Sequence, residues 1–301
     1  MELRHFRYFL AVVEQGSFTR AAQALHISQP TLSQQIRVLE REVGATLLVR
    51  EPGGIAPTAS GAVFYEHVVA ILAATADAVS AARHRAAGPR TLRIGIAGPL
   101  PGDVQVPVIS AFKAAFPEVR TAWRALELNE LDRPLLDGDV DVALIRLPVD
   151  PERLDWEVLV DDEPRAVLVP TGHPLAEAGT LTLEDVIDAA FVAIADSVPL
   201  TAQRWWTFYE ERNHEDARFL GEPVDTVAAA ALSIRLNGVP CPGPFALRDT
   251  LAPSGIETLP MTGLSPTVTV AARRRSDEGL PEVFCELAAR TVRELRAAGA
   301  I

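Results

Sequence analysis

The segment from residue 28 to residue 43 carries side chains suited to hydrogen-bonding a nucleic acid. Ser28 can cap a helix, and Pro30 fits its first turn, where a missing N–H is harmless. At about 100° per residue, one face is apolar and consists of Leu32, Ile36, Leu39 and Val43. The opposite face consists of Pro30, Gln34, Arg37 and Arg41, with Ser33 at its border. Because Arg and Gln pair with base edges, the pattern indicates either a DNA-reading helix or the solvated face of an ordinary bundle.

Catalytic chemistry has no comparable pattern. The sequence lacks a Gly-x-Ser-x-Gly elbow, a Gly-x-Gly-x-x-Gly fingerprint, a Walker loop and a His-Glu-x-x-His pair. Its six histidines are scattered, so we expect no metal site and no cofactor. The residues favour a binding protein over an enzyme.

Charge is distributed unevenly along the 301 residues, whose formal net charge is -12. Residues 1–90 hold nine arginines and seven acids, whereas the rest of the chain has a net charge of -14. An acidic large part would repel a duplex, but the N-terminal part can bind DNA if its arginines share one face. The chain has no signal-peptide pattern and no apolar run of about 18 residues, so we expect a cytoplasmic protein without membrane contact.

The elements around the polar helix predict a small DNA-binding module. Apolar residues from Leu3 to Val13 follow helical spacing, and Gly16 followed by Ser17 gives a helix stop and then an N-cap. A second helix from Ser17 leads into the third, which runs from Ser28 to Gly44. Residues 47–57 then read as strand, turn and strand. Together these elements predict a winged helix-turn-helix.

Residues 2–67 resemble the DNA-binding domain of the LysR-type transcriptional regulators. The motifs that carry the resemblance are residues 6–12, 16–22, 28–33, 39–40, 43–44 and 47–48, together with Ile36. The resemblance implies groove or phosphate contacts at Thr19, Arg20, Gln29, Pro30, Thr31, Ser33, Gln34, Arg37 and Arg50. The family's wing usually carries several basic residues, and this wing has none after Arg50, so the salt dependence of DNA binding should be shallow for the family.

A long helix is predicted to follow from Ala59 to about Ala87, capped by Thr58 and ended by Gly88-Pro89. Alternating spacings of three and four residues place Tyr65, Val68, Leu72, Thr75 and Val79 in one stripe. A rod of about 45 Å is too long for one small domain to bury. We therefore expect two chains to pair through Tyr65, Val68, Leu72 and Val79, and the resemblance implies the same use of a linker helix.

From Thr91 short apolar strands alternate with helices, which predicts two α/β lobes. Residues 135–145 and 172–175 resemble the family's effector domain, which is similar to periplasmic binding proteins. The strand from Thr267 and the helix from Leu280 are expected to return to the first lobe. The predicted fold class is thus α/β with an all-α, winged N-terminal module, a long linker helix and a two-lobed periplasmic-binding-protein-like effector domain. The boundaries are 1–58, 59–89 and 90–301, with lobe I at 90–161 and 266–301 and lobe II at 162–265.

Ligands of open α/β sheets bind outside the carboxyl ends of the strands. Where relatives place Ser or Thr, this chain has Gly98-Pro99-Leu100-Pro101 and Leu126-Glu127-Leu128. Arg146 follows a strand and is the candidate partner for an anionic group; the alternative is that it pairs with an acid such as Asp103. The predicted effector site consists of Pro99, Leu100, Leu128, Arg146, Ser197, Thr201 and Thr226. The effector would be small and mostly apolar, with one anionic or polar end.

The sequence thus predicts a DNA-binding regulator with a small-molecule sensor. Its expected partners are double-stranded DNA, a small-molecule effector, further copies of the chain in a homodimer or homotetramer, and RNA polymerase if it is an activator. One alternative is redox sensing through Cys241 and Cys285, although neither is flanked by cations that would lower a thiol pKa. Another is a solute-binding protein or enzyme that carries a helical N-terminal module.

Overall fold

The N-terminal domain is a three-helix unit with a two-stranded wing. A computed structural model describes residues 1–51, 54–86 and 91–301, so Pro52 and Gly53 of the predicted wing and residues 87–90 of the predicted linker lie outside the described residues. The elements of this domain are α1 (Leu3–Gln15), α2 (Phe18–Ala24), α3 (Gln29–Val43), β1 (Leu48–Glu51) and β2 (Gly54–Pro57). Buried apolar residues of the three helices, among them Phe9, Leu32 and Leu39, form one core.

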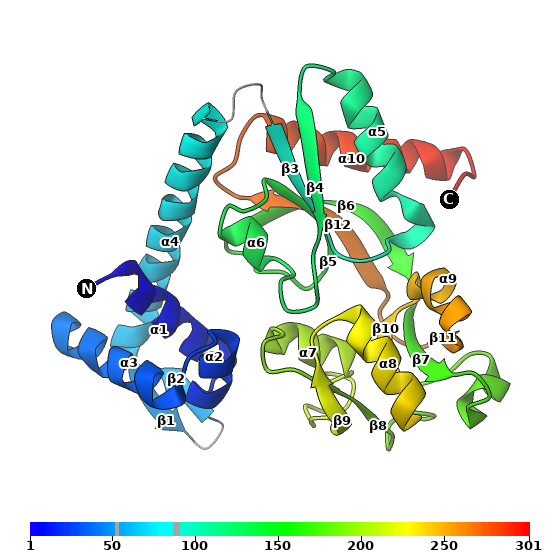
Figure 1. Cartoon of the computed structure of the whole chain (residues 1–301), viewed down its shortest axis with the longest axis horizontal. Helices are drawn as coiled ribbons and strands as arrows, with labels where there is room; N and C mark the ends of the chain where they lie inside the picture. The colour runs from blue at the N-terminus through cyan, green and yellow to red at the C-terminus, as the bar shows by residue number, and fades with distance from the viewer. Residues whose placement is uncertain (52–53, 87–90) are drawn as a thin grey trace.

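Helix α4 (Ala59–Ala86) leads from the wing to the second half of the chain (Figure 1). The Thr58 hydroxyl accepts from the Gly61 amide at 3.0 Å, so Thr58 caps this helix as the sequence predicts. A Cβ at Gly61 would stand 1.9 Å from the Leu47 carbonyl oxygen. Only glycine therefore lets α4 approach the start of the wing this closely.

Lobe I contains a five-stranded sheet of order β4-β3-β5-β12-β6, with β3 parallel to β4 and β5 and with β12 antiparallel to β5 and β6. Its elements are β3 (Thr91–Ile96), η1 (Pro101–Asp103), α5 (Gln105–Ala115), β4 (Arg120–Ala125), α6 (Arg133–Leu136), β5 (Val142–Arg146), β6 (Leu154–Glu163), β12 (Thr267–Arg274) and α10 (Leu280–Ala297). Helices α5 and α10 pack together, and Phe112 meets Phe284 edge to face at 5.3 Å. Strand β12 and helix α10 lie in lobe I, so the chain comes back to this lobe after lobe II.

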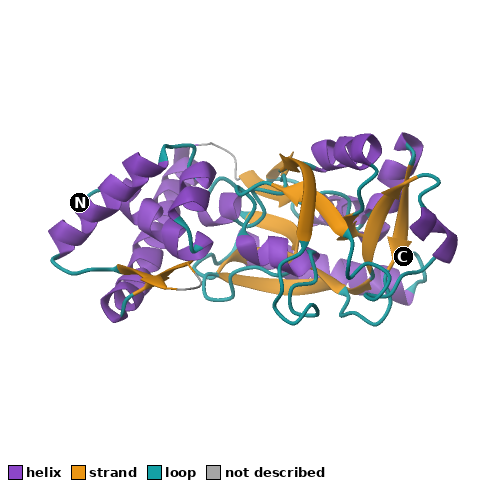
Figure 2. Cartoon of the chain, turned by 90° about the horizontal axis from the view of Figure 1, so that it is seen from below, coloured by secondary structure: helices purple, strands orange, loops and turns teal. Residues whose placement is uncertain are grey.

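Lobe II is built around an antiparallel three-stranded sheet and a parallel pair of strands. Its elements are β7 (Arg165–Pro170), η2 (Pro174–Ala178), β8 (Ala190–Ile194), α7 (Leu200–Trp206), β9 (Arg218–Val224), α8 (Val227–Asn237), β10 (Cys241–Pro244), α9 (Leu247–Leu251), η3 (Ala252–Ser254) and β11 (Ile256–Pro260). Strands β10 and β11 flank β7 on either side, both antiparallel, and β8 pairs with β9 in parallel. Lobe II therefore contains two separate sheets, β10-β7-β11 and β8-β9. Figure 2 shows the mainly helical N-terminal domain at one end of the molecule and most strands in the other part.

Helix α7 ends at Trp206. Phe208 adopts φ 62°, a left-handed conformation that a helix cannot continue through. Strand β9 was not predicted, because six of its seven residues are exposed and its side chains do not alternate between apolar and polar.

Candidate nucleic-acid interface and effector region

Helix α3 presents one buried face and one polar face. Leu32, Ile36 and Leu39 are at most 2% exposed, so this side forms the core of the domain. The Ser28 Oγ accepts from the Thr31 amide at 3.3 Å and lies 2.7 Å from the Thr31 hydroxyl, which fixes the start of the helix. Gly44 ends it in a left-handed conformation with φ 76°.

The wing stands beside α3 because the two are tied by hydrogen bonds. One carboxylate oxygen of Glu40 accepts from the amides of Leu47 and Leu48, at 2.8 and 3.2 Å. The Ile55 amide donates to the Gly16 carbonyl at 2.8 Å. A Cβ at Gly54 would lie 2.6 Å from that same carbonyl oxygen, so the close approach requires glycine.

A groove of about 210 Å³ lies between α3 and the wing. The residues that line it are Phe18, Ser33, Ile36, Arg37, Glu40, Leu48, Val49, Arg50 and Ile55. Ser33 and Arg37 come from the helix and Arg50 from the wing, so three of the predicted DNA contacts meet here. Pro30, Thr31 and Gln34 are exposed on α3, and Thr19 is exposed on α2.

Arg20 and Gln29 are placed differently from the other predicted DNA contacts. The Arg20 guanidinium donates to the Gln15 carbonyl through Nε and Nη2, at 3.1 and 2.5 Å. It thereby satisfies the carbonyl of the last residue of α1. Gln29 is half-buried at the first position of α3. The Arg20 guanidinium is therefore already hydrogen-bonded within the DNA-binding domain.

The predicted dimerisation stripe on α4 packs against its own chain. Val68 is fully buried in the core of the DNA-binding domain, and Tyr65 and Leu72 pack against the same core. Burial raises the pKa of the Tyr65 hydroxyl to about 12, and the charge of Glu14 adds to the shift. These three side chains are therefore occupied before any partner binds, which corrects the seam expected from spacing alone. The side chain of Val79 lies outside the described residues.

Another face of α4 is exposed to solvent. Val63 is 57% exposed and Ile71 is 42% exposed, and Ala70, Ala74 and Ala78 are exposed too. Small and apolar side chains on one exposed side of a long helix are suited to close helix packing.

In the effector region, Arg146 is almost enclosed, with 9% of its side chain exposed. Its Nε lies 2.8 Å from Glu163, and its two terminal nitrogens donate to the carbonyls of Ala97 and Pro99, at 3.2 and 2.6 Å. Glu163 also accepts from the Ala246 amide of lobe II at 3.0 Å. The acid that pairs with Arg146 is thus Glu163, not the Asp103 considered as the alternative from the sequence.

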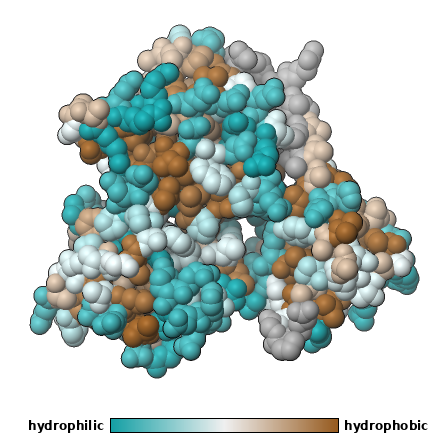
Figure 3. Space-filling model, turned by 180° about the vertical axis from the view of Figure 1, so that it is seen from behind, coloured by the Kyte–Doolittle hydropathy of each residue, from teal (hydrophilic) through white to brown (hydrophobic). Residues whose placement is uncertain are grey.

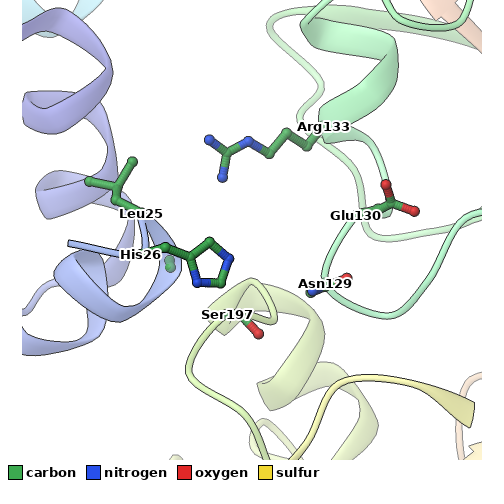
Figure 4. A pocket seen from close by; sticks show the side chains of 7 residues that line it. Leu25, His26, Asn129, Glu130, Arg133 and Ser197 are labelled. Carbon is green, nitrogen blue, oxygen red and sulfur yellow. The ribbon is translucent and has the colours of Figure 1, made fainter. Parts of the chain in front are cut away.

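The other predicted effector residues are spread over several environments. Leu100 is 2% exposed within the core of lobe I, so it is a packing residue rather than an open wall of a site. Leu128 is half-buried, and the next residue, Asn129, donates across the lobes to Asp225 at 3.4 Å. Thr226 caps α8 by accepting from the Ala229 amide, and Thr201 is exposed on α7. Ser197 faces a separate pocket, shown in Figure 4, together with Asn129.

The two cysteines lie in different hydrophobic clusters, Cys285 in lobe I and Cys241 in lobe II. Burial raises the pKa of each thiol to about 12. Protonated thiols are poor nucleophiles, which disfavours a redox role.

Neither a metal centre nor a membrane span emerges from the described part of the chain. No group of three His, Cys, Asp or Glu side chains there is arranged to hold a metal ion. None of the helices described is long and apolar enough to cross a bilayer.

A winged helix-turn-helix joined by a long helix to a two-lobed α/β domain defines a DNA-binding protein with a separate sensor domain. The family model described as "Bacterial regulatory helix-turn-helix protein, lysR family" matches residues 3–62. The model described as "LysR substrate binding domain" matches residues 85–296. The chain belongs to the LysR family of bacterial transcriptional regulators.

Individual relatives agree with this assignment. The HTH-type transcriptional regulator AlsR of Bacillus subtilis (strain 168) is 32% identical over 210 residues, which span 69% of this chain and 67% of AlsR. The chain spans about two thirds of the length of the curated relatives it matches. The crystal structure of full-length BenM has a TM-score of 0.56 at 25% identity and covers 100% of this chain and 98% of its own. Full-length CbnR in complex with its target DNA shares the fold, with a TM-score of 0.51 at 23% identity, covering 97% of this chain and 100% of its own.

Several residues of these sites had no signal in the sequence. Glu163 is 17 positions from Arg146 and meets it only because β6 and β5 flank β12 in one sheet. Glu14 and Arg153 are 139 positions apart, yet their side chains meet at 3.2 Å. Periodicity within one element cannot indicate contacts of this kind.

Proposed function

We propose that this protein binds operator DNA through the groove between α3 and the wing and that a small molecule bound between the two lobes changes this binding. The observation that carries the proposal is the meeting of Ser33, Arg37 and Arg50 in that groove. Exposed Thr31 and Gln34 extend the same polar surface of α3. An α-helix of this kind fits the major groove, where Arg and Gln read base edges.

The effector site is proposed to lie where Pro99, Leu128, Arg146 and Thr226 approach the boundary of the lobes. Because Glu163 balances the charge of Arg146, an anionic effector must displace Glu163 or share its arginine. Glu163 also accepts from Ala246 of lobe II, so its displacement would alter a contact between the lobes. This gives a physical route from ligand binding to a change in lobe position.

Footprinting of the purified protein on the DNA that flanks its own gene, with and without candidate metabolites, tests both parts. A footprint that changes with one metabolite supports the proposal. Arg146→Ala should then keep the footprint without effector and lose the effector's influence. Calorimetry that shows full effector affinity in this variant would exclude Arg146 from the site.

Assembly into dimers or tetramers is part of the same proposal. Exposed apolar side chains lie on both lobes, with Val106 and Trp123 in lobe I and with Phe219, Leu220, Leu232 and Leu236 in lobe II. Trp123 is 69% exposed on the edge strand β4 and Leu236 is 74% exposed on α8. Such patches mark interaction surfaces. Leu236→Asp should lower the assembly state in sedimentation, whereas Ser254→Asp, at an exposed polar position of lobe II, serves as the control.

The remaining parts of the proposal follow from operator binding. The protein would act in the cytoplasm, where bacterial operators lie, and would contact RNA polymerase at promoters that it activates. No catalytic step is proposed.

A further inference from the structure

The DNA-binding domain touches the effector domain of its own chain. One Arg153 Nη of lobe I lies 3.2 Å from the Glu14 carboxylate near the end of α1. The Nε of the same guanidinium lies 2.5 Å from a carboxylate oxygen of Asp150. Because only 14% of the Arg153 side chain is exposed, the cation is enclosed between the two domains.

Further charged and polar groups surround this ion pair. Asp132, Asp150 and Arg133 of lobe I act on the Glu14 carboxylate, and Tyr65 of α4 is within electrostatic reach of both Glu14 and Arg153. Burial alone would lower the pKa of Arg153, but Glu14, Asp150 and Asp132 together raise it. One cation therefore compensates several carboxylates from both domains.

Between the two domains lies a pocket of about 280 Å³ that is open to solvent and that we call the junction pocket. Its lining comes from three parts of the fold: Ala24 at the end of α2 with Leu25 and His26 of the turn that follows, then Asn129, Glu130 and Arg133 of lobe I, and Ser197 of lobe II. Figure 4 shows the Arg133 and His26 side chains facing this space from opposite sides. Figure 3 shows a hollow between the DNA-binding domain and the two lobes.

The segment 127–133 of lobe I belongs to two contacts at once. Asn129 bonds across the lobes to Asp225, while Asn129, Glu130 and Arg133 line the junction pocket opposite the helix-turn-helix turn. A change in the separation of the lobes would therefore displace residues that face the turn leading into α3.

We propose that residues 129–133, Asp150 and Arg153 form a docking surface for the DNA-binding domain of the same chain, with Glu14 as its main contact. The docked state fixes the orientation of α3 relative to the lobes, and segment 127–133 makes that orientation depend on lobe closure. The use of docking in regulation rests on the proposed function. Docking itself is measured without DNA or effector, so its failure is distinguishable from a failure of the proposed function.

The experiment measures the distance between spin labels on Gln23→Cys of α2 and Glu118→Cys of lobe I, both exposed positions. Cys285 is buried but Cys241 is half-buried, so Cys241 is replaced by Ser in every labelled chain. Labelled chains are mixed with an excess of unlabelled chains, so that each measured pair lies within one chain. The docked state predicts one narrow distance distribution.

Glu14→Lys places two cations face to face, and Arg153→Glu adds a carboxylate to those of Asp132 and Asp150. Each substitution should lower the ratio of docked to undocked chains about five-fold, the change that about 1 kcal/mol produces. The distance distribution should then become broad. The double variant Glu14→Lys/Arg153→Glu should restore the narrow distribution, since the ammonium group introduced on α1 then faces the carboxylates of lobe I. Glu2→Lys, the same charge change at the other end of α1, should leave it narrow.

A native distribution that is already broad, or one that neither reversal alters, would overturn the proposal. So would two broad single variants that the double variant does not rescue. Thermal melts of all variants identify any loss caused by unfolding, and in that event Glu14→Gln and Arg153→Gln replace the reversals. Arg153→Gln must then broaden the distribution, because it leaves Glu14, Asp132 and Asp150 without their cation.

Discussion

Arg37 and Arg50 reach the same groove from different elements, one from α3 and one from β1. A guanidinium there is useful only if the fold leaves it without an internal partner of its own. Arg20 shows the opposite case, because the Gln15 carbonyl holds its guanidinium within the domain, whereas Arg146 can take an anionic ligand only by displacing Glu163 or sharing the arginine with it. At the scale of the residue, a cation's partners decide whether it binds an external ligand.

Arg37→Ala should weaken operator binding by about 1–3 kcal/mol if the side chain makes a bidentate base contact. Gln34→Ala should instead relax the preference at one base position. Titrations on operator and scrambled duplexes at one salt concentration measure both effects. Arg4→Ala removes the same charge from an exposed position on α1 and should change affinity little. Equal affinities for native protein and both α3 variants would remove α3 from the reading surface.

The elements that begin with an N-cap were the most predictable from the sequence. Ser17, Ser28 and Thr58 cap α2, α3 and α4 as expected, because a cap is a local interaction. The antiparallel partners of β7 were not predicted, since strand pairing depends on segments far apart in the chain. For the same reason, the sequence could not predict that Arg146 pairs with Glu163 or that Leu100 is buried. His26 adopts φ 53° in the turn before α3, and its place in the junction pocket had no sequence signal.

Helix α4 illustrates why a stripe does not identify its partner. The spacing of Tyr65, Val68 and Leu72 indicated a buried face correctly, but the DNA-binding core of the same chain covers it. We expect the opposite, exposed side with Val63 and Ile71 to pair with a second chain.

Ile71→Asp should therefore lower the assembly state in sedimentation while the melting temperature of the chain changes little. Val68→Asp should act differently, because a carboxylate at a fully buried position destabilises the domain core. Circular dichroism melts separate the two effects. A dimer that survives Ile71→Asp would show that α4 pairs through another surface.

At the scale of the whole molecule, the bond between Asn129 and Asp225 links lobe closure to the docking surface. Asp225→Ala removes this bond without altering any group that faces Glu14. The distance distribution between the labels on Gln23→Cys and Glu118→Cys should then broaden. Asp196→Ala, at a neighbouring acidic position of lobe II, is the matched control and should leave the distribution narrow. An unchanged distribution in Asp225→Ala would mean that docking is independent of the lobes.

Docking should also respond to pH, and the direction follows from its carboxylates. Burial raises the pKa of both Glu14 and Asp132 despite the opposing charge of Arg153. The charged groups around Glu14 are Arg153, Asp132, Asp150 and Arg133, and Tyr65 faces it from α4. If docking supplies part of this burial, the docked state binds protons more tightly than the undocked state. Docking is then favoured as pH falls and weakened as pH rises through the raised pKa values.

The measurement is the fraction of narrow label distances between about pH 8 and pH 5. His26 is replaced by Gln in every sample, because it lines the junction pocket and is itself titratable. Glu14→Gln should show a smaller pH response, because it removes one of the two carboxylates whose pKa is raised. The remaining response belongs to Asp132, which Asp132→Asn removes. A docked fraction that rises with pH would contradict the electrostatic account of the docking surface.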